Sequence, residues 1–172
     1  VKEDNFFRIY YRENSQDYVD MVLNNALKSL YEIEKDFDYQ PGSKIDIIIY
    51  PDYKEMANKI GLGTGSTAMG VYYGGIISIL EPKKWISGEY DIGEIFTKEG
   101  PVLHELTHYV VDHQTSGNVP VWFTEGLALY EEYNVNGVEW GENIKHITRL
   151  KYLKKGFMSL MKQRLTGSLF SS

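Results

Sequence analysis

The sequence has 172 residues, of which 42% are hydrophobic and 24% charged, and this composition is ordinary for a folded chain that buries its core in one domain. The net charge of −6 and the lack of a basic cluster argue against a nucleic-acid partner, and no apolar run approaches the length of a membrane span. There is no cysteine, so disulfide scaffolds and thiolate metal sites are excluded and any metal ligand must be His, Asp or Glu.

The first half of the chain predicts strands and helices in alternation. The β-prone run FFRIYY predicts a strand at Phe6–Tyr11. Apolar residues at helical spacing then predict an amphipathic helix from Ser15 to about Phe37. KIDIIIY (Lys44–Tyr50) predicts a short buried strand, and Pro51 opens a short helix that ends near Ile60.

Two glycine-containing stretches follow. GLGTGST (Gly61–Thr67) predicts a loop; it lacks the lysine of a P-loop and does not lie between a strand and a helix, so no phosphate site is expected there. MGVYYGGIISIL (Met69–Leu80) predicts one long strand, in which the Gly74–Gly75 pair marks a bulge or a close backbone approach.

The second half contains VLHELTHYVVDHQTSGNVPVWFTEGLALYEEY, from Val102 to Tyr133. A helix is predicted from Val102 to about Thr115, a break at Ser116–Asn118, and a second helix that starts at Pro120.

Within the first of these helices, His104 and His108 are four residues apart and therefore share one face, so both can point at one ion. Glu105 projects beside them and can reach a water on that ion. His-Glu-x-x-His is the pattern of zinc hydrolases, in which the imidazoles hold zinc with one coordination position open and the glutamate acts as the base. The alternative is that both histidines are ordinary surface or core residues.

A third ligand is expected from the second helix. About eight residues, or roughly 12 Å of helix, separate His108 from the break, and Pro120 to Glu125 covers roughly 8 Å of the return. If the two helices pack antiparallel, Glu125 returns to the level of the histidines and completes a His₂Glu zinc site.

Other candidates for the third ligand fit less well. His113 lies five residues after His108, where the metzincin pattern needs six, and Val111 stands where that pattern needs glycine. Glu131 and Glu132 are alternative ligands, but they fit a solvated helix end better.

Two segments resemble a known group of enzymes. HELTHYVVDHQTSG resembles the active-site helix of thermolysin-type peptidases. PVWFTEGLALY resembles the glutamate helix of the gluzincins, in particular the Trp-x-x-Glu-Gly-x-Ala pattern of zinc aminopeptidases and bacterial peptidase-MA-like proteins. The predicted elements from residue 5 to residue 133 follow in the same order.

The resemblance implies an α+β, zincin-like fold over residues 1–172 as a single domain. Residues 1–92 would form a mixed half with a small twisted mixed sheet, residues 93–172 a helical lobe, and the zinc cleft would lie between them. Met69–Leu80 takes the place of the edge strand that borders this cleft. An internal strand paired on both sides is the alternative for that segment.

The resemblance also implies roles for individual residues. One Zn²⁺ would be held by His104, His108 and Glu125, with Glu105 as the general base and a peptide or protein as the substrate. An edge strand offers unpaired backbone groups to an extended peptide. The residues expected to bind the substrate in this way are Tyr72, Tyr73, Gly74 and Gly75.

The sequence departs from the family pattern at three places. No Gly-x-Met-Glu-Asn motif precedes the zinc helix, so exopeptidase activity is not expected. Leu129 replaces the thermolysin-type aspartate that follows the third ligand by one turn, which leaves the hydrogen-bond partner of the zinc histidines unassigned. The Tyr or His that stabilises the oxyanion is not found at a matching position; Tyr130 is the candidate for this catalytic role and His146 a second one, with a structural role as the alternative for each.

We therefore expect a zinc-dependent endopeptidase. The alternatives are a catalytically silent, zinc-stabilised peptide-binding module and a zinc aminopeptidase. Glu105 favours an enzyme, because a structural zinc site needs ligands but no base.

The resemblance and the start at Val1 lead us to expect a bacterial protein secreted to the extracellular space or cell surface, with the cytoplasm as the alternative. Relatives continue into further helices beyond the position of TGSLFSS, so the substrate-clamping residue is expected to lie outside this sequence or to be absent.

Overall fold

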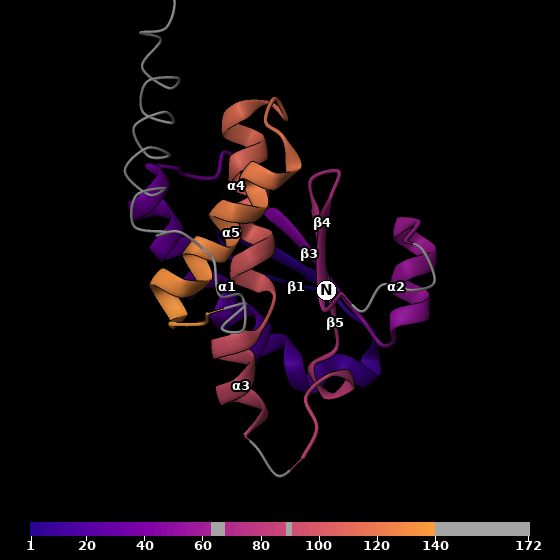
Figure 1. The fold of residues 1–172 in the computed structure, drawn as a ribbon. Coiled ribbons are helices and arrows are strands. Elements are labelled where there is room, and N and C mark those ends of the chain that lie inside the picture. Colours follow the sequence, from indigo (N-terminus) through magenta and orange to yellow (C-terminus); the bar gives the residue numbers. More distant parts are fainter. Residues whose placement is uncertain (63–67, 89–90, 140–172) are drawn as a thin grey trace, which may run out of the picture. The chain divides into compact units, whose positions relative to one another are not determined.

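The computed structural model describes residues 1–62, 68–88 and 91–139. The chain divides into two units, Val1–Val138 and Glu139–Ser172, and every element described below belongs to the first. Within the described residues, this unit combines five α-helices with one five-stranded mixed sheet (Figure 1). The sequence predicts helices together with a small mixed sheet, and this part of the predicted fold class is confirmed.

The sheet has the strand order β1-β2-β3-β5-β4. Strands β2 and β3 are parallel, as are β3 and β5, whereas β1 pairs antiparallel with β2 and β4 pairs antiparallel with β5. Their bounds are Lys2–Glu3, Phe7–Tyr10, Ile45–Tyr50, Gly70–Tyr73 and Ile76–Leu80 for β1 to β5. Strand β4 is therefore an edge of the sheet, next to the internal strand β5.

One face of the sheet forms the core of the unit. Parallel register brings Ile47 beside Ile9 on one side and Ile77 on the other. The helices α1 (Val19–Phe37) and α4 (Val102–Thr115) pack on each other, α1 also contacts β2, and α4 also contacts β4 and β5. The strand side chains that are at most 2% exposed are Phe7, Ile9, Ile45, Ile47, Ile49, Ile77 and Ile79.

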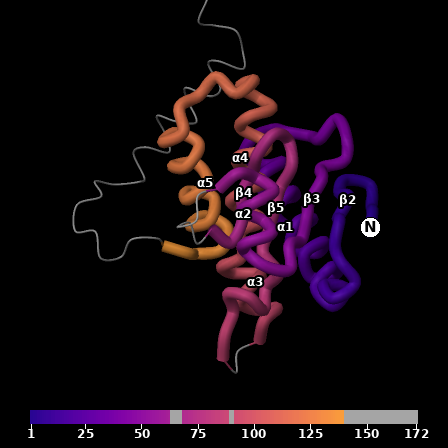
Figure 2. Tube along the Cα trace, turned by 90° about the vertical axis from the view of Figure 1, so that its right-hand side faces the viewer, coloured from indigo at the N-terminus to yellow at the C-terminus, as the bar shows by residue number. Residues whose placement is uncertain are grey.

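A smaller helix, α2 (Tyr53–Ile60), lies on the other side of the β4–β5 hairpin from α4, as the two views agree (Figures 1 and 2). The strand Ile45–Tyr50 leads into it, and it contacts β3 and β5. The Asp52 side chain accepts a hydrogen bond from the Glu55 N–H at 2.8 Å, so α2 begins after this cap and not at Pro51.

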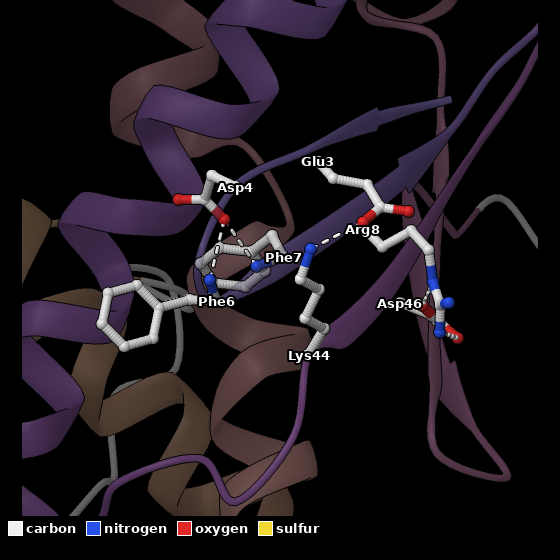
Figure 3. Close-up of polar contacts among 7 residues, drawn as sticks. All are labelled: Glu3, Asp4, Phe6, Phe7, Arg8, Lys44 and Asp46. Atoms are coloured by element: carbon white, nitrogen blue, oxygen red, sulfur yellow. Dashed lines mark hydrogen bonds and ion pairs between the residues drawn. The ribbon is translucent and has the colours of Figure 1, made fainter.

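Polar contacts hold the N-terminal strands together (Figure 3). Arg8 donates from Nε and Nη2 to the two carboxylate oxygens of Asp46, at 2.7 and 3.2 Å, across β2 and β3. Lys44 Nζ lies 2.6 Å from Glu3, and Asp4 accepts two backbone N–H groups of the turn that follows it. The charged side chains of the two ion pairs are between 27% and 45% exposed, so solvent partly screens their charges.

The segment Met69–Leu80 is a hairpin and not the single long strand that was predicted. Gly74 and Gly75, with φ of +57° and +86°, form the two-residue turn between β4 and β5. Two consecutive positive φ angles match the twist of a tight hairpin and favour glycine at both positions. A Cβ at either glycine would meet nothing within 4 Å, so the predicted bulge or close approach at this pair is wrong.

Other boundaries differ from the predictions by a few residues. The residues before Val19, predicted to begin α1, belong to a 3₁₀ turn, η1 (Glu13–Tyr18), and a second such turn, η2, spans Pro82–Lys84. The helix α3 (Ile92–Glu99) was not predicted as a separate element; the Asp91 carboxylate caps it by accepting two N–H groups. No helix in the described parts of the chain is long and apolar enough to cross a lipid bilayer.

The edge strand β4 comes very close to the start of α4 at Gly70. A Cβ on Gly70 would lie 2.6 Å from Cβ of Pro101 and 3.0 Å from Cγ of Glu105. Real Cβ atoms do not come so near to other carbon atoms, so only glycine permits this approach. The missing side chain at Gly70 therefore sets the distance between the hairpin and α4.

We expect Gly70→Ala to lower the free energy of unfolding by about 1–3 kcal/mol, because the added methyl group forces β4 or α4 to move. Gly126→Ala is the matched control: a Cβ there meets nothing within 4 Å, and alanine replaces glycine inside a helix. The control should therefore raise the free energy of unfolding by up to about 1 kcal/mol. Urea denaturation measures both values, and an unchanged stability of Gly70→Ala would contradict the close contact.

Candidate metal centre

The centre is built on two packed helices, α4 and α5 (Val121–Asn136), which run in opposite directions (Figure 1). The helix α4 ends at Ser116, which has φ +52°, and Gly117 follows with φ +69°. This pair of left-handed residues turns the chain, and Pro120 leads directly into α5. The break and the return helix lie where the sequence predicts them.

Three side chains from these helices converge. Nε2 of His104 lies 3.4 Å from Oε2 of Glu125, and Nε2 of His108 lies 3.4 Å from Oε1 of the same carboxylate. One ligand atom from each residue falls within 4.8 Å of the other two, which is a geometry that could hold a metal ion. The three residues are those that the sequence singles out as ligands. Searched over the described residues, the chain has no other group of three such side chains this close together.

The second ring nitrogen of each histidine is held by α5. Nδ1 of His104 lies 3.1 Å from Oε2 of Glu132, and Nδ1 of His108 contacts the hydroxyl of Thr124. A carboxylate only accepts hydrogen bonds, so Nδ1 of His104 carries the proton and its Nε2 is free to bind a cation. The helix α5 thus provides the ligand Glu125 and a partner for each histidine.

Glu132 is the hydrogen-bond partner of His104 that the sequence left unassigned. It is 5% exposed and Glu131 is 1% exposed, so the prediction that these two residues form a solvated helix end is wrong. Seven residues make about two helical turns, so Glu132 lies on the same face of α5 as Glu125, about 20° away. The seven-residue spacing from Glu125 is the sequence signal for this partner; the position one turn after Glu125, where thermolysin-type sequences have aspartate, is Leu129.

Glu105 lies beside the ligands in a buried position. It is 7% exposed, and its Oε2 accepts a hydrogen bond from the backbone N–H of Tyr72 at 2.7 Å. Burial raises the pKa of the Glu105 carboxyl to about 7, and the negative charges of Glu125 and Glu132 also raise it. The charge of His104 and the Tyr72 N–H lower this pKa, but by less than burial raises it.

The two histidines differ in their electrostatic surroundings. Burial lowers the pKa of His104, but the hydrogen bond with Glu132 and the nearby carboxylates outweigh burial, so this pKa lies above its ordinary value. For His108, burial and then the charge of His104 lower the pKa below its ordinary value. Glu125 and Glu132 raise the pKa of both histidines, but at His108 burial and the charge of His104 outweigh them.

Tyr72 joins the edge strand to α4 at two points. Its N–H donates to Glu105, and its hydroxyl donates to Oδ2 of Asp112 at 2.5 Å. Burial raises the pKa of the Tyr72 phenol, as does its hydrogen bond to Asp112. In an antiparallel strand the N–H and C=O of one residue point the same way, so the Tyr72 carbonyl also faces away from β5. The other predicted substrate residues lie at the end of the hairpin: Tyr73 is 70% exposed, and Gly74–Gly75 form the turn.

The remaining candidates lie apart from the ligand set. The Tyr130 hydroxyl donates to Oδ1 of Asn134 at 3.2 Å, and five residues of helix place Tyr130 about 140° around α5 from Glu125. Its catalytic role stays a prediction. Nδ1 of His113 donates to the Tyr109 carbonyl at 2.9 Å, in agreement with its exclusion as a ligand. His146 lies outside the described residues.

We expect Glu132→Gln to weaken zinc binding by about 10- to 100-fold, because the amide can still accept the hydrogen bond from His104 but has lost the charge that makes the imidazole a stronger ligand. Glu34→Gln, a half-buried glutamate on α1, is the matched control and should leave the affinity unchanged. Competition with a chromophoric chelator measures the dissociation constant of zinc for both variants. Equal affinities would mean that Glu132 does not support the site.

The chain matches no protein-family model, no curated protein and no solved structure. Its function is therefore inferred from the geometry and chemistry of the centre described above.

Proposed function

We propose that this chain is a zinc-dependent endopeptidase of the gluzincin type, with a zincin-like fold. The observation that carries the proposal is the placement of His104 and His108, each with Nε2 at 3.4 Å from a different oxygen of Glu125. Glu105 follows His104 in the sequence and is buried. It provides the general base, which a purely structural zinc site does not need.

The donor set fits zinc. Two ligand atoms that are each about 2.0–2.1 Å from a tetrahedral zinc ion lie roughly 3.3–3.4 Å apart. Nε2 of each histidine lies 3.4 Å from one oxygen of Glu125, close to this value, although the two distances run to different oxygens of the carboxylate. With one ligand atom taken from each residue, the three atoms lie within 4.8 Å of one another, so the side chains would draw closer together around a bound ion. Three protein ligands of the His₂Glu type leave one coordination position for water and substrate, as catalytic zinc sites require.

The proposed mechanism assigns the proton transfers to Glu105. When bound, zinc supplies Lewis-acid chemistry, which activates a water molecule and polarises the peptide carbonyl. Glu105 accepts the proton of the attacking water and delivers it to the leaving amine. The Tyr72 N–H fixes one oxygen of this carboxylate at 2.7 Å, so the other oxygen can take the proton. Burial strengthens each of these interactions because little water competes for them.

The free edge of strand β4 is evidence in favour of a peptide substrate. Strand β4 pairs only with β5 among the described strands, and the backbone of Tyr72 faces the open side, next to Glu105. An extended peptide that pairs with the Tyr72 carbonyl would lie along this edge, with its own carbonyl groups near the base. No motif that anchors a free amino terminus precedes α4, and this favours an endopeptidase over an aminopeptidase.

We expect the purified protein to bind one zinc ion, Glu105→Gln to retain it, and His108→Ala to lose it. Hydrolysis of a mixed peptide library should fall by at least about 10²-fold in Glu105→Gln, because the amide keeps the shape of the side chain but cannot act as a base. Metal analysis and mass spectrometry of the peptides give both readouts. Zinc binding with no difference in hydrolysis between wild type and Glu105→Gln would instead support a silent peptide-binding module.

Backbone pairing with β4 needs its own test. Replacing Gly75 with proline would not test this pairing. Proline cannot adopt the φ of +86° found there, so the substitution would break the hairpin turn itself. We expect single N-methyl groups, placed along a cleaved peptide outside the scissile bond, to lower kcat/KM by about tenfold at one position, where one hydrogen bond to the strand is lost. Equal cleavage of all the N-methylated peptides would rule out pairing with the edge strand.

A further inference from the structure

A cavity of about 220 Å³ opens beside the candidate metal centre. His108 and Glu125, two of the three proposed ligands, form part of its wall. The rest comes from the second half of α4, from the link between α4 and α5, from the first turn of α5, and from Tyr72 of the edge strand. A side chain of a peptide held next to the metal would therefore be within reach of this cavity.

The walls of the cavity combine aliphatic surface with one acidic group. Val119 and Val121 supply accessible aliphatic surface, whereas Val111 is 0% exposed, and Asp112 supplies a carboxylate that the metal centre does not use. Neither lysine nor arginine occurs among the residues that line the cavity. Along the described parts of the chain, no cationic side chain forms an ion pair with Asp112.

Asp112 is held in place but retains capacity to bind. Its Oδ2 accepts the hydroxyl of Tyr72 at 2.5 Å, and Gly117 keeps the space near Oδ1 clear, since a Cβ there would lie 3.2 Å from this oxygen. An ionised carboxylate accepts about four hydrogen bonds, so one neutral donor does not saturate it. The fixed position makes Asp112 a preorganised acceptor.

These features suit one class of side chain. Lysine and arginine have aliphatic stems that pack against valine and cationic ends that need a carboxylate. An acidic side chain would be repelled by both Asp112 and Glu125, whereas an uncharged aliphatic side chain would gain the contacts with valine but leave the carboxylate without a cation.

We propose that this cavity selects a lysine or arginine side chain of the peptide substrate, and that Asp112 is the residue that determines this specificity. The proposal rests on the proposed peptidase function, because it assumes a peptide held across the metal centre. It adds a substrate preference that His104, His108, Glu125 and Glu105 do not by themselves imply.

The test uses zinc-loaded Glu105→Gln protein, which is expected to bind peptides without cleaving them, and calorimetry with acetyl-Ala-Ala-X-Ala-Ala-amide. X is lysine, norleucine or glutamate. Because alanine side chains do not fix how the peptide aligns with strand β4, the peptide can shift along this strand until residue X enters the cavity. The lysine peptide should bind about tenfold more tightly than the norleucine peptide, the scale of one charge-assisted hydrogen bond, and the glutamate peptide should bind most weakly. Equal binding of the lysine and norleucine peptides would overturn the proposal, as would a failure of all three to bind.

Adding Asp112→Asn should abolish the advantage of lysine over norleucine, because the amide keeps an oxygen for the Tyr72 hydroxyl but carries no charge. Asp17→Asn, an exposed carboxylate on η1 that does not line the cavity, is the matched control and should leave the advantage intact. A preference for lysine that survives Asp112→Asn would show that another group selects it. If Asp112→Asn does not fold, the three-peptide comparison still decides the proposal, since it involves no change at Asp112.

Cleavage by the wild-type protein separates this proposal from the proposed function. Lysine and arginine should be enriched at one position beside the scissile bond of a peptide library, and Asp112→Asn should remove the enrichment. Hydrolysis without such enrichment would overturn the specificity and leave the peptidase function standing. If the lysine peptide binds through Asp112 but the protein hydrolyses no peptide, the specificity stands and the peptidase function is overturned.

Discussion

The candidate metal centre depends on the packing of α5 against α4, because side chains of α5 lie next to both ring nitrogens of His104 and His108 on α4. Glu125 faces the two Nε2 atoms, while Thr124 and Glu132 contact the two Nδ1 atoms. Glu132 follows Glu125 by about two turns and shares its face of α5, whereas Thr124 projects about 100° around the helix from Glu125. A shift of α5 along its axis by one residue would break all of these contacts together, so the fold determines the ligand geometry and the protonation of the rings at once.

The same packing gathers negative charge from two buried glutamates, Glu105 and Glu132, and from Glu125, whose side chain is 48% exposed. Glu105, Glu125 and Glu132 interact closely enough for the last two to raise the pKa of the first. Mutual repulsion among carboxylates destabilises a helix pair unless a cation offsets it. A zinc ion at the proposed site would supply that cation, and because it would bind the folded helix pair more tightly than the unfolded chain, metal binding and stability would be coupled.

The edge hairpin couples the sheet to this centre. Gly70 lets β4 approach the start of α4, which brings the Tyr72 N–H onto Glu105 and the Tyr72 hydroxyl onto Asp112. One tyrosine therefore links the proposed base, through its backbone, with the proposed specificity residue, through its side chain. The β4 edge, the base and the acidic cavity consequently belong to one rigid arrangement on α4.

The sequence by itself determined the parts that depend on local spacing. The four-residue separation of His104 and His108, and the break followed by Pro120, were enough to predict α4, α5 and the ligand cluster with Glu125, because helical rise and periodicity are fixed by the backbone. The tertiary structure decided what depends on contacts between distant segments. Gly70 became the close approach because α4 lies against it, and Glu132 became a buried partner of His104 because α5 returns along α4. Each of these residues is more than 25 positions from its partner in the chain, so the sequence does not show the contact. The hairpin turn at Gly74–Gly75 is different, because two glycines between β-prone runs are a local signal of a turn.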